Sequence, residues 1–354
     1  MPVSLPALIS GSLLAFLTTW VLSLGFTHFI LFPHLLDYPN ARSLHGRPVP
    51  RMGGLALSAG ILVGMAWSAG TVASPPHHLL AVLLTGWAPL AMVSFLDDRR
   101  GVVAKWRILM HLFAAVSLLV ANLAPRWLDL PGFIAPLTAG VAIPLTLLFG
   151  VWMINLYNFM DGMDGFAGGM AVIGFSTLAW LGRADVGFTA FCLTVAAASA
   201  GFLVHNFPPA RLFLGDTGST TLGFLAAACS LWGAQTELFP FWIAMLVFSP
   251  FSVDASVTLL RRLLRGENVW EAHRTHYYQR LVLLGWGHRR TVLAEYTLML
   301  ACAGSALLAA PAPPAGQAAL ALGWVVIYIL LMRGVGRLEQ RRATAATPRQ
   351  TSIP

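Results

Sequence analysis

The sequence of 354 residues is 57% hydrophobic and only 10% charged, and its formal net charge is +8. An ordinary soluble domain carries about 25% charged residues. The mean hydropathy of +0.72 therefore indicates a polytopic membrane protein and excludes an ordinary soluble one. The positive charge does not indicate a nucleic-acid-binding protein, because the arginines lie in short loops between apolar runs. We expect the lipid bilayer as a partner and no nucleic acid.

Apolar stretches recur along the whole chain, and a helix needs roughly 20 mostly apolar residues to cross a membrane. The first stretch follows an N-terminus without the features of a cleaved signal peptide, so we expect it to remain as an anchor. The sequence predicts an all-α, polytopic transmembrane helical bundle of about eleven (10–11) spans. These spans cover residues 7–32, 54–71, 78–96, 107–124, 137–157, 166–182, 187–205, 218–235, 240–263, 291–310 and 316–333.

The basic residues predict the orientation of the bundle. Eleven spans divide the loops into two sets, one on each side of the membrane. One set, with the helix ends that border it, holds 20 of the 22 Lys and Arg residues, and the other holds only Arg126 and Arg183. Cytoplasmic loops carry the excess of basic residues, so we expect the N-terminus outside and the C-terminus in the cytoplasm. We expect residues 1–333 to form the integral membrane domain and residues 334–354 a mobile, basic cytoplasmic tail.

Three segments that carry carboxylates follow predicted spans on the cytoplasmic side. They are "SFLDDRRGV" with Asp97 and Asp98, "NLYNFMDGMDGFAGG" with Asp161 and Asp164, and "RLFLGDTGS" with Asp216. One isolated pair would mean little, because polar residues collect at membrane interfaces. Five of the 14 acidic residues on one predicted side, however, can converge on a single cavity. We therefore expect an active site on the cytoplasmic face.

A group of carboxylates repels itself unless a cation binds. Asp161 and Asp164 are three residues apart, so one helical turn would place them on the same face. Ligation by carboxylate oxygens suits Mg²⁺, with Mn²⁺ as the alternative, and Mg²⁺ commonly completes its shell with waters and substrate phosphates. The acids therefore predict a Mg²⁺ site for a phosphate-bearing substrate. The glycines beside them would let a ligand approach the backbone, or would serve tight helix packing.

Two basic loops on the same predicted side are candidates for binding an anion. The loop "NARSLHGRPVPRMGG" carries His45 and Arg51, and a longer loop that includes "EAHRTHYYQR" carries His273, Arg274 and His276. A zinc site is conceivable for the two histidines, but the sequence shows no third soft ligand. Contact with an anionic phosphate is favoured, whereas many other arginines are expected to be topology signals or lipid-headgroup contacts.

Taken in order, the segments "NARSLHGRPVPRMGG", "FLDDRRG", "NLYNFMDGMDGFAGG", "NFPPARLFLGDTGSTTLGF" and "EAHRTHYYQRLVLLGWGHRRTV" resemble one family. It is that of the polyprenyl-phosphate N-acetylhexosamine-1-phosphate transferases, with the phospho-MurNAc-pentapeptide translocases as a more distant branch. The resemblance runs from about Asp37 to Val292. It implies an enzyme of the bacterial plasma (inner) membrane that transfers a sugar 1-phosphate from a UDP-N-acetylhexosamine to undecaprenyl phosphate. The products are a polyprenyl-diphospho-sugar and UMP, Mg²⁺ is required, and a homodimer is suggested.

The resemblance, the chemistry of the reaction and the basic loops together suggest roles for individual residues. Asp216 matches the metal-binding aspartate, and Asp98 would position metal or phosphate. Asp97 would deprotonate the acceptor phosphate, although a covalent role for Asp97 stays open. The other catalytic or substrate-binding residues would be Asp161, Asp164, His276, Asn155, Asn158, Asn206, Phe213 (stacked on uracil), His45, Arg51, His273 and Arg274.

The sequence departs from the translocase branch at the histidine motif. The segment His273-Arg274-Thr275-His276 replaces three consecutive histidines, which argues against a muramoyl-pentapeptide donor. The resemblance therefore favours the enzymes that start O-antigen and other surface polysaccharides, with the N-acetylated sugar left open. An ion-coupled secondary transporter is the main alternative, but it would need acids deep within the spans. A CDP-alcohol phosphatidyltransferase would need an arginine that "DGFAGG" lacks.

Overall fold

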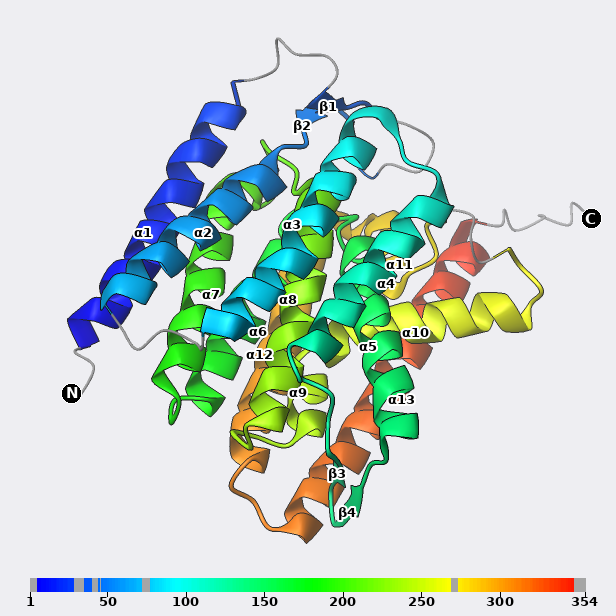
Figure 1. Ribbon diagram of the computed structural model, residues 1–354. Helices are drawn as coiled ribbons and strands as arrows, with labels where there is room; N and C mark the ends of the chain where they lie inside the picture. Colours follow the sequence, from blue (N-terminus) through cyan, green and yellow to red (C-terminus); the bar gives the residue numbers. More distant parts are fainter. Residues whose placement is uncertain are drawn as a thin grey trace, which may run out of the picture.

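The computed structural model describes residues 5–28, 35–39, 44, 46–71, 77–268 and 273–346. Over these residues the chain folds as a bundle of helices with two small hairpins (Figure 1). The helices are α1 (Leu5–Phe26), α2 (Gly53–Thr71), α3 (His77–Arg100), α4 (Ala104–Val120), α5 (Ala139–Phe159), α6 (Phe166–Leu181), α7 (Val186–Asn206), α8 (Gly215–Gln235), α9 (Phe241–Val247), α10 (Ser249–Leu264), α11 (Tyr277–Leu281), the π-helix η3 (Val282–Trp286), α12 (Gly287–Ala309) and α13 (Pro314–Ala346).

Each predicted span overlaps a helix, and the ninth overlaps two, α9 and α10, which meet at a bend of 80°. By length and apolarity, seven helices of the described residues can cross a membrane, or eight if the bent pair is one span. The helices α4 and α6 fall short of this standard, with 17 and 16 residues. The all-α polytopic bundle is therefore confirmed, whereas the count of about eleven spans and their orientation stay predictions.

The last helix is longer than the sequence predicts. The helix α13 runs to Ala346, so it does not end at the expected boundary near residue 333. Its final turns are also held to the bundle, because Glu339 pairs with Arg280 and Arg342 donates to the carbonyl of Leu283. The predicted tail thus begins as part of a helix, and residues 347–354 lie outside the described part.

Two short antiparallel hairpins interrupt the helical pattern. Leu36–Asp37 (β1) pairs with Val49–Pro50 (β2), and Trp127–Leu130 (β3) pairs with Phe133–Pro136 (β4). The tight turn of the second hairpin needs Gly132, whose φ of +77° is a conformation that glycine adopts readily. Figure 1 shows the two hairpins at opposite ends of the bundle.

The helix α8 lies at the centre of the bundle. All its residues from Thr217 to Gly233 are buried, and it packs against α2, α3 and α5, which places it inside a ring of neighbours. Its small residues make this approach possible: a Cβ on Gly54 of α2 would lie 2.2 Å from the backbone nitrogen of Gly218. Buried hydrogen bonds add to the packing, since the indole of Trp87 donates to Thr221.

The outer helices expose apolar side chains, as expected for contact with lipid. The helix α1 exposes Ile9 and Val21, and α13 exposes Leu322, Val326 and Leu330. In a soluble protein such faces would mark interaction surfaces or aggregation sites. On helices long and apolar enough to span a membrane they indicate the lipid-facing side.

Three chain reversals meet at one end of the bundle, which we call the site end. They connect α3 to α4, α5 to α6, and α7 to α8. In Figure 1 this end is the upper one, where β1 and β2 also lie. The chain order thus brings the segments of Asp98, Asp161 and Asp216 to one place although they are far apart in sequence.

The contact between α2 and α8 predicts that Gly54→Ala destabilises the protein. The new methyl group would meet the backbone of Gly218, which cannot move aside cheaply, and overpacking of this kind typically costs about 1–3 kcal/mol. We expect a thermal midpoint several degrees lower in detergent, measured by scanning fluorimetry. Gly323→Ala is the matched control, because no heavy atom lies within 4 Å of a Cβ at Gly323. An equal midpoint in the two variants would contradict the close approach.

Candidate active site

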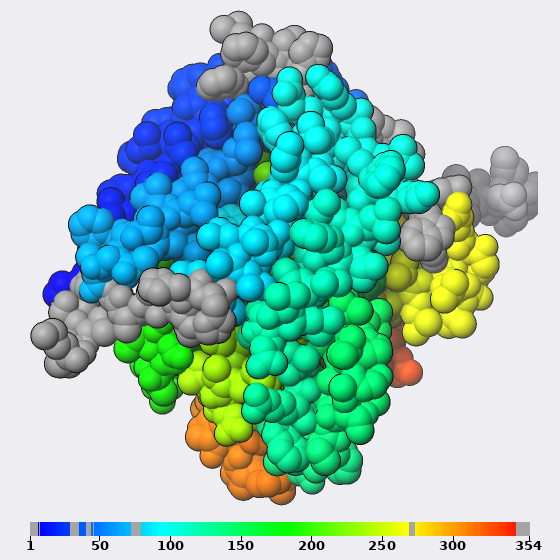
Figure 2. All heavy atoms as spheres, in the orientation of Figure 1, coloured from blue at the N-terminus to red at the C-terminus, as the bar shows by residue number. Residues whose placement is uncertain are grey.

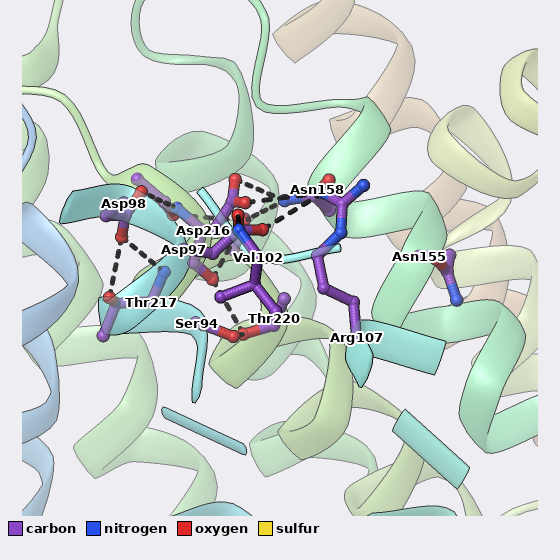
Figure 3. Close-up of polar contacts among 12 residues, drawn as sticks. Ser94, Asp97, Asp98, Val102, Arg107, Asn155, Asn158, Asp216, Thr217 and Thr220 are labelled. Carbon is purple, nitrogen blue, oxygen red and sulfur yellow. Dashed lines mark hydrogen bonds and ion pairs between the residues drawn. The ribbon is translucent and has the colours of Figure 1, made fainter. Parts of the chain in front are cut away.

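The first turn of α8 is held by a carboxylate from another helix. Oδ1 of Asp98 accepts the backbone N–H of Asp216 at 2.8 Å, and Oδ2 accepts the N–H of Thr217 at 3.0 Å and its hydroxyl at 2.7 Å (Figure 3). These N–H groups have no acceptor within the helix, and a negative charge at a helix N-terminus is favourable. Gly215 makes the approach possible, because a Cβ there would lie 2.8 Å from Oδ2 of Asp98. Asp98 is therefore a cap for α8 as well as a wall of the site.

Asp216 points away from this cap toward α5 and α4. Its Oδ1 accepts a hydrogen bond of 2.8 Å from Nδ2 of Asn158, which also donates to the hydroxyl of Ser219. Its Oδ2 lies 3.9 Å from Nη1 of Arg107, too far for a hydrogen bond. One oxygen of Asp216 is thus oriented by an amide, and the other keeps its coordination capacity for a ligand.

Both side-chain oxygens of Asp97 accept hydrogen bonds from the segment that follows α3. Its Oδ1 accepts the backbone N–H of Val102 at 2.6 Å, and its Oδ2 accepts from Nη1 of Arg107 at 3.1 Å. The side chain of Asp97 is 9% exposed, whereas that of Arg107 is 42% exposed. Asp97 therefore holds Arg107 between two carboxylates, its own and that of Asp216, with part of the guanidinium open to solvent or ligand.

Two cavities flank Asn158 and Asp216. The larger, of about 280 Å³, is lined by Asp37, Leu44, Arg51, Asp98, Asn158, Phe159, Asp161, Gly162, Met163, Asp164, Asn206, Phe213, Gly215, Asp216, Tyr278, Gln279 and His288. The smaller, of about 120 Å³, is lined by Ser94, Asp97, Ala104, Arg107, Ile108, His111, Asn155, Asn158, Phe159, Asp216 and Thr220. They share Asn158, Phe159 and Asp216, so two ligands could meet at Asp216.

Asp161 is a carboxylate of the larger cavity that is available to a ligand. No hydrogen bond to its side chain is found among the described residues, although it lines the cavity wall. Burial raises the pKa of Asp161 well above its ordinary value, and the nearby carboxylates of Asp216, Asp98 and Asp164 raise this pKa further. This repulsion is what a bound cation would relieve.

Asp164 contributes to the same wall through different contacts. Its Oδ1 lies 3.0 Å from Nδ1 of His288, and its Oδ2 accepts the backbone N–H of Ala210 at 2.9 Å. Nε2 of His288 lies 3.2 Å from the carbonyl oxygen of Leu44. Asp164 therefore joins the loop after α5 to the loop before α8 and to the start of α12.

Asn206 also ties two loops of the site together. Its carbonyl oxygen accepts the N–H of Gly165 at 2.8 Å, and its amide donates to the carbonyl of Leu212 at 2.9 Å. Gly165 has a φ of +76°, a left-handed conformation that glycine adopts without strain. The side-chain oxygen and nitrogen of Asn206 are both engaged, which favours a role in shaping the cavity.

The remaining predicted substrate contacts divide into three groups. Arg51 and Phe213 line the larger cavity; Arg51 pairs with Asp37 at 2.8 Å and has a buried Nε without an acceptor in the described part of the chain. Asn155 lines only the smaller cavity, where its Nδ2 lies 3.1 Å from Nδ1 of His111. His45 lies outside the described residues.

The structure places the histidine motif behind the cavity wall. His276 is 4% exposed, does not line either carboxylate cavity, and lies against the ring of Phe159 at a centroid distance of 6.3 Å. Its neighbours in sequence, Tyr278 and Gln279, line the larger cavity instead. The role of His276 as a catalytic residue stays a prediction, and the geometry supports a positioning role.

Asp254 explains how this segment is held. Its position in α10 would allow it to pair with Arg261 or Arg262, but the structure shows other partners. Oδ1 of Asp254 accepts the backbone N–H of Tyr277 at 2.9 Å, and Oδ2 accepts that of Tyr278 at 3.1 Å. Nδ1 of His276 lies 3.3 Å from the same carboxylate. Asp254 therefore caps α11 much as Asp98 caps α8.

His273 and Arg274 lie away from the carboxylates. Burial lowers the pKa of His273 to about 4, with the nearby His276 and Arg262 lowering it further, so the ring is neutral near pH 7. Its Nδ1 accepts the hydroxyl hydrogen bond of Thr275 at 2.8 Å. Arg274 lines a separate basic cavity. The structure does not bring either residue into the carboxylate cavities.

The carboxylates of the larger cavity suit a Mg²⁺ ion that keeps water and phosphate ligands. They suit a metal ion bound by protein side chains alone less well. Within the described ranges no cluster of three or more His, Cys, Asp or Glu side chains has the geometry of a metal site. Mg²⁺ commonly takes only one or two carboxylates and fills its shell with water and phosphate oxygens. Asp216 and Asp161 have oxygens to offer, whereas those of Asp98 are hydrogen-bonded to α8.

Several site residues were missed by sequence reasoning. His288 and Asp37 line the larger cavity, and Arg107 and His111 line the smaller one. Arg107 was counted among the topology signals, and its position one turn into a helix after the Asp97 segment was the available clue. His288 stands at the start of α12 in a Gly-Trp-Gly-His sequence, where only the fold shows that Asp164 is its partner.

Comparisons with known proteins find relatives that match most of this chain. A sequence model of glycosyl transferase family 4 matches residues 80–234, which include Asp97, Asp98, Asp161, Asp164 and Asp216. A probable undecaprenyl-phosphate N-acetylglucosaminyl 1-phosphate transferase of Bacillus subtilis is 31% identical over 304 residues, which cover 84% of this chain and 82% of the relative.

Two further relatives extend the comparison. A decaprenyl-phosphate N-acetylglucosaminephosphotransferase of Mycobacterium leprae is 31% identical over 82% of this chain and 80% of its own. A phospho-N-acetylmuramoyl-pentapeptide-transferase of a Synechococcus strain is 34% identical over 70% of this chain and 75% of its own. Both kinds of relative named by the resemblance are therefore found.

The different environments of Asp98 and Asp161 predict that their substitution affects stability differently in the absence of ligands. Asp98→Asn places an amide beside the N–H donors of α8 and loses hydrogen bonds to a charged group, each typically about 1.5–3 kcal/mol. Asp161→Asn removes a carboxylate whose ionisation is opposed by burial and like charges. In metal-free detergent solution we expect the thermal midpoint to fall for Asp98→Asn and to stay or rise for Asp161→Asn. A larger loss for Asp161→Asn would contradict these assignments.

Proposed function

The chain belongs to glycosyl transferase family 4, and on that premise we propose that it is a UDP-N-acetylhexosamine:polyprenyl-phosphate sugar-1-phosphate transferase. The donor phosphate would be attacked by the phosphate of a polyprenyl lipid, undecaprenyl phosphate in most bacteria, and UMP would leave. The observation that carries the proposal is the convergence of three carboxylate segments on two cavities that share Asp216. Two phosphate-bearing substrates need such a meeting point.

The two cavities suit the two substrates. The larger has a polar wall and the half-buried aromatic ring of Phe213, which fits a uracil stacked on it and a diphosphate among Arg51 and the acids. The smaller is lined by Ile108 of α4, a helix that also exposes Leu109, Leu112 and Val116. A lipid phosphate could reach the smaller cavity from this apolar face. We therefore assign the nucleotide sugar to the larger cavity and the acceptor phosphate to the smaller.

The proposed cofactor is Mg²⁺, with Mn²⁺ as the alternative. Asp216 and Asp161 would hold it, and Asp98 would act mainly by fixing the start of α8. A bound Mg²⁺ would offset the negative charge of the phosphates and of these acids. Asn158 holds one oxygen of Asp216 in place, which leaves the other for the metal.

The remaining residues would gather and align the two anions. Arg107 lies beside Asp97 and Asp216 and is partly exposed, so it can hold the acceptor phosphate. Asp97 keeps Arg107 in place and lines the same cavity, where it would take a proton from that phosphate. A covalent phospho-aspartyl intermediate at Asp97 is the competing scheme, and trapping one would overturn the role of base.

We further propose that this reaction is the first membrane step of surface polysaccharide synthesis of the O-antigen type, in the bacterial plasma membrane. The site end would face the cytoplasm, where UDP-sugars are found, in agreement with the distribution of basic residues. The absence of three consecutive histidines at 273–276 argues against a muramoyl-pentapeptide donor. The N-acetylated sugar is therefore GlcNAc, GalNAc or a deoxy relative such as FucNAc or QuiNAc.

The alternative of an ion-coupled transporter is less well supported. Such a carrier would hold its acids near the middle of the membrane, whereas Asp98, Asp161 and Asp216 lie at one end of the bundle. Two acids lie within predicted spans, Asp254 and Glu295. Of these, Asp254 is occupied by backbone groups of α11.

A donor panel tests the proposed reaction directly. Purified protein with undecaprenyl phosphate and Mg²⁺ is incubated in turn with UDP-GlcNAc, UDP-GalNAc, UDP-FucNAc, UDP-QuiNAc and UDP-MurNAc-pentapeptide. We expect UMP release and a lipid product heavier by one N-acetylhexosamine phosphate with at least one of the first four. Product from none of them, or only from the pentapeptide donor, would refute the proposal.

Asp216→Asn tests the metal assignment. The variant keeps the hydrogen-bonding shape but loses the charge, so we expect Mg²⁺-dependent UMP release to fall on the order of 100-fold or more. Asp185→Asn is the matched control, because Asp185 caps α7 by accepting from the N–H of Phe188 and lines neither carboxylate cavity. Unchanged release by Asp216→Asn, in folded protein, would remove Asp216 from the metal site.

A further inference from the structure

A basic cavity lies beside α10, apart from the carboxylates. It has a volume of about 530 Å³, and the arginines among its lining residues are Arg261, Arg262, Arg265, Arg274, Arg280 and Arg342. The carboxylates in this lining are Glu267 and Glu339. None of the residues that line it lines either carboxylate cavity. The cavity is therefore a separate feature that the proposed reaction does not use.

The arginines are brought together by specific contacts. Arg280 forms a bidentate pair with Glu339 of α13, with N···O distances of 2.7 and 2.6 Å, and its guanidinium lies 4.5 Å from the ring centroid of Tyr277. Arg261 donates to the hydroxyl of Tyr277 and lies 5.7 Å from the centroid of the same ring. Guanidinium groups held this close repel one another unless anions lie among them.

The described lining residues carry more positive than negative charge. Glu339 is taken by Arg280, and Glu267 pairs with Arg262 at 2.8 Å and more loosely with Arg265 at 3.8 Å. Arg265 and Arg274 remain exposed at the rim. Planar guanidinium groups bind phosphate oxygens in pairs, so the charge and geometry suit a phosphate-bearing anion.

The surroundings indicate that this anion is attached to a lipid. The helix α10 carries exposed apolar side chains next in sequence to its arginines, namely Leu260, Leu263 and Leu264, and the exposed Leu283 lies in the cavity wall itself. Figures 1 and 2 show the end of α10, in yellow, projecting from the side of the bundle. A basic cavity flanked by exposed leucines suits a headgroup with its acyl chains against the helices.

We infer that this cavity binds the phosphodiester headgroup of an anionic phospholipid from the surrounding membrane. The bound headgroup bridges α10, α11 and the end of α13. It also acts on the site, because Tyr277 and Arg280 in the basic cavity belong to the same short helix as Gln279, which lines the larger carboxylate cavity.

The experiment measures the thermal midpoint of the full-length protein in a neutral maltoside detergent. Phosphatidylglycerol, phosphatidylcholine with the same acyl chains, undecaprenyl phosphate and inorganic phosphate are added separately. A ligand that binds only the folded state raises the midpoint in proportion to its occupancy. We expect phosphatidylglycerol to raise the midpoint by several degrees, and phosphatidylcholine and inorganic phosphate to leave it unchanged.

The variant that tests the site is Arg265→Gln with Arg274→Gln. Both side chains are exposed at the rim, so the variant should fold. We expect it to lose at least half of the shift with phosphatidylglycerol. The control is Arg333→Gln with Arg337→Gln, which removes the same charge from exposed positions of α13 outside the cavity lining and should keep the full shift.

Three results would overturn the inference. A full shift in the Arg265→Gln, Arg274→Gln variant would show that the lipid binds elsewhere. An equal shift with inorganic phosphate would show that no lipid is required. If the shift with undecaprenyl phosphate depended on Arg265 and Arg274 and the shift with phosphatidylglycerol did not, the cavity would be assigned to the acceptor of the reaction. Because the experiment measures stability, its result does not depend on whether the proposed reaction is confirmed.

Discussion

The hydrogen bonds between Asp98 and the start of α8 are the constraint on which the site depends. α8 is the buried centre of the bundle, and its first N–H groups emerge where the carboxylate segments meet. These groups need acceptors, and Asp98 of α3 supplies both oxygens. This single contact fixes α3 against α8, aims Asp216 toward α5, and leaves Asp216 with one oxygen for a ligand.

The same device recurs at the second wall of the site. Asp254 accepts the N–H groups of Tyr277 and Tyr278, and so holds α11 against the larger cavity. In both places the oxygens of one acid accept backbone N–H groups. That acid therefore positions a neighbouring segment that lines the cavity. An aspartate in a membrane enzyme can therefore be required without touching substrate, and a loss of activity on its substitution does not identify a metal ligand.

The sequence was sufficient for the helices and for the convergence of the acids, because apolar length and the placement of charge survive without tertiary information. It could not separate the roles of Asp97, Asp98 and Asp216, since adjacent acids at a helix end point in different directions that only the packing of α3 on α8 decides. It assigned His276 a catalytic role, which stays a prediction, but it could not show that the His276 ring packs on Phe159. His288 was missed because its partner, Asp164, lies 124 residues away.

There is a physical reason why most aspartates of the site are paired within the protein and only some are open to a ligand. Burying five free carboxylates together would be prohibitively costly, so most of them are neutralised by the protein itself: Asp97 by Arg107, Asp98 by the start of α8, and Asp164 by Ala210 and His288. What remains unsatisfied is concentrated at Asp161 and one oxygen of Asp216. In the proposed function, these oxygens would hold one divalent cation between the two cavities. The charge that would bring the two proposed phosphates together is thus confined to the region that both cavities share.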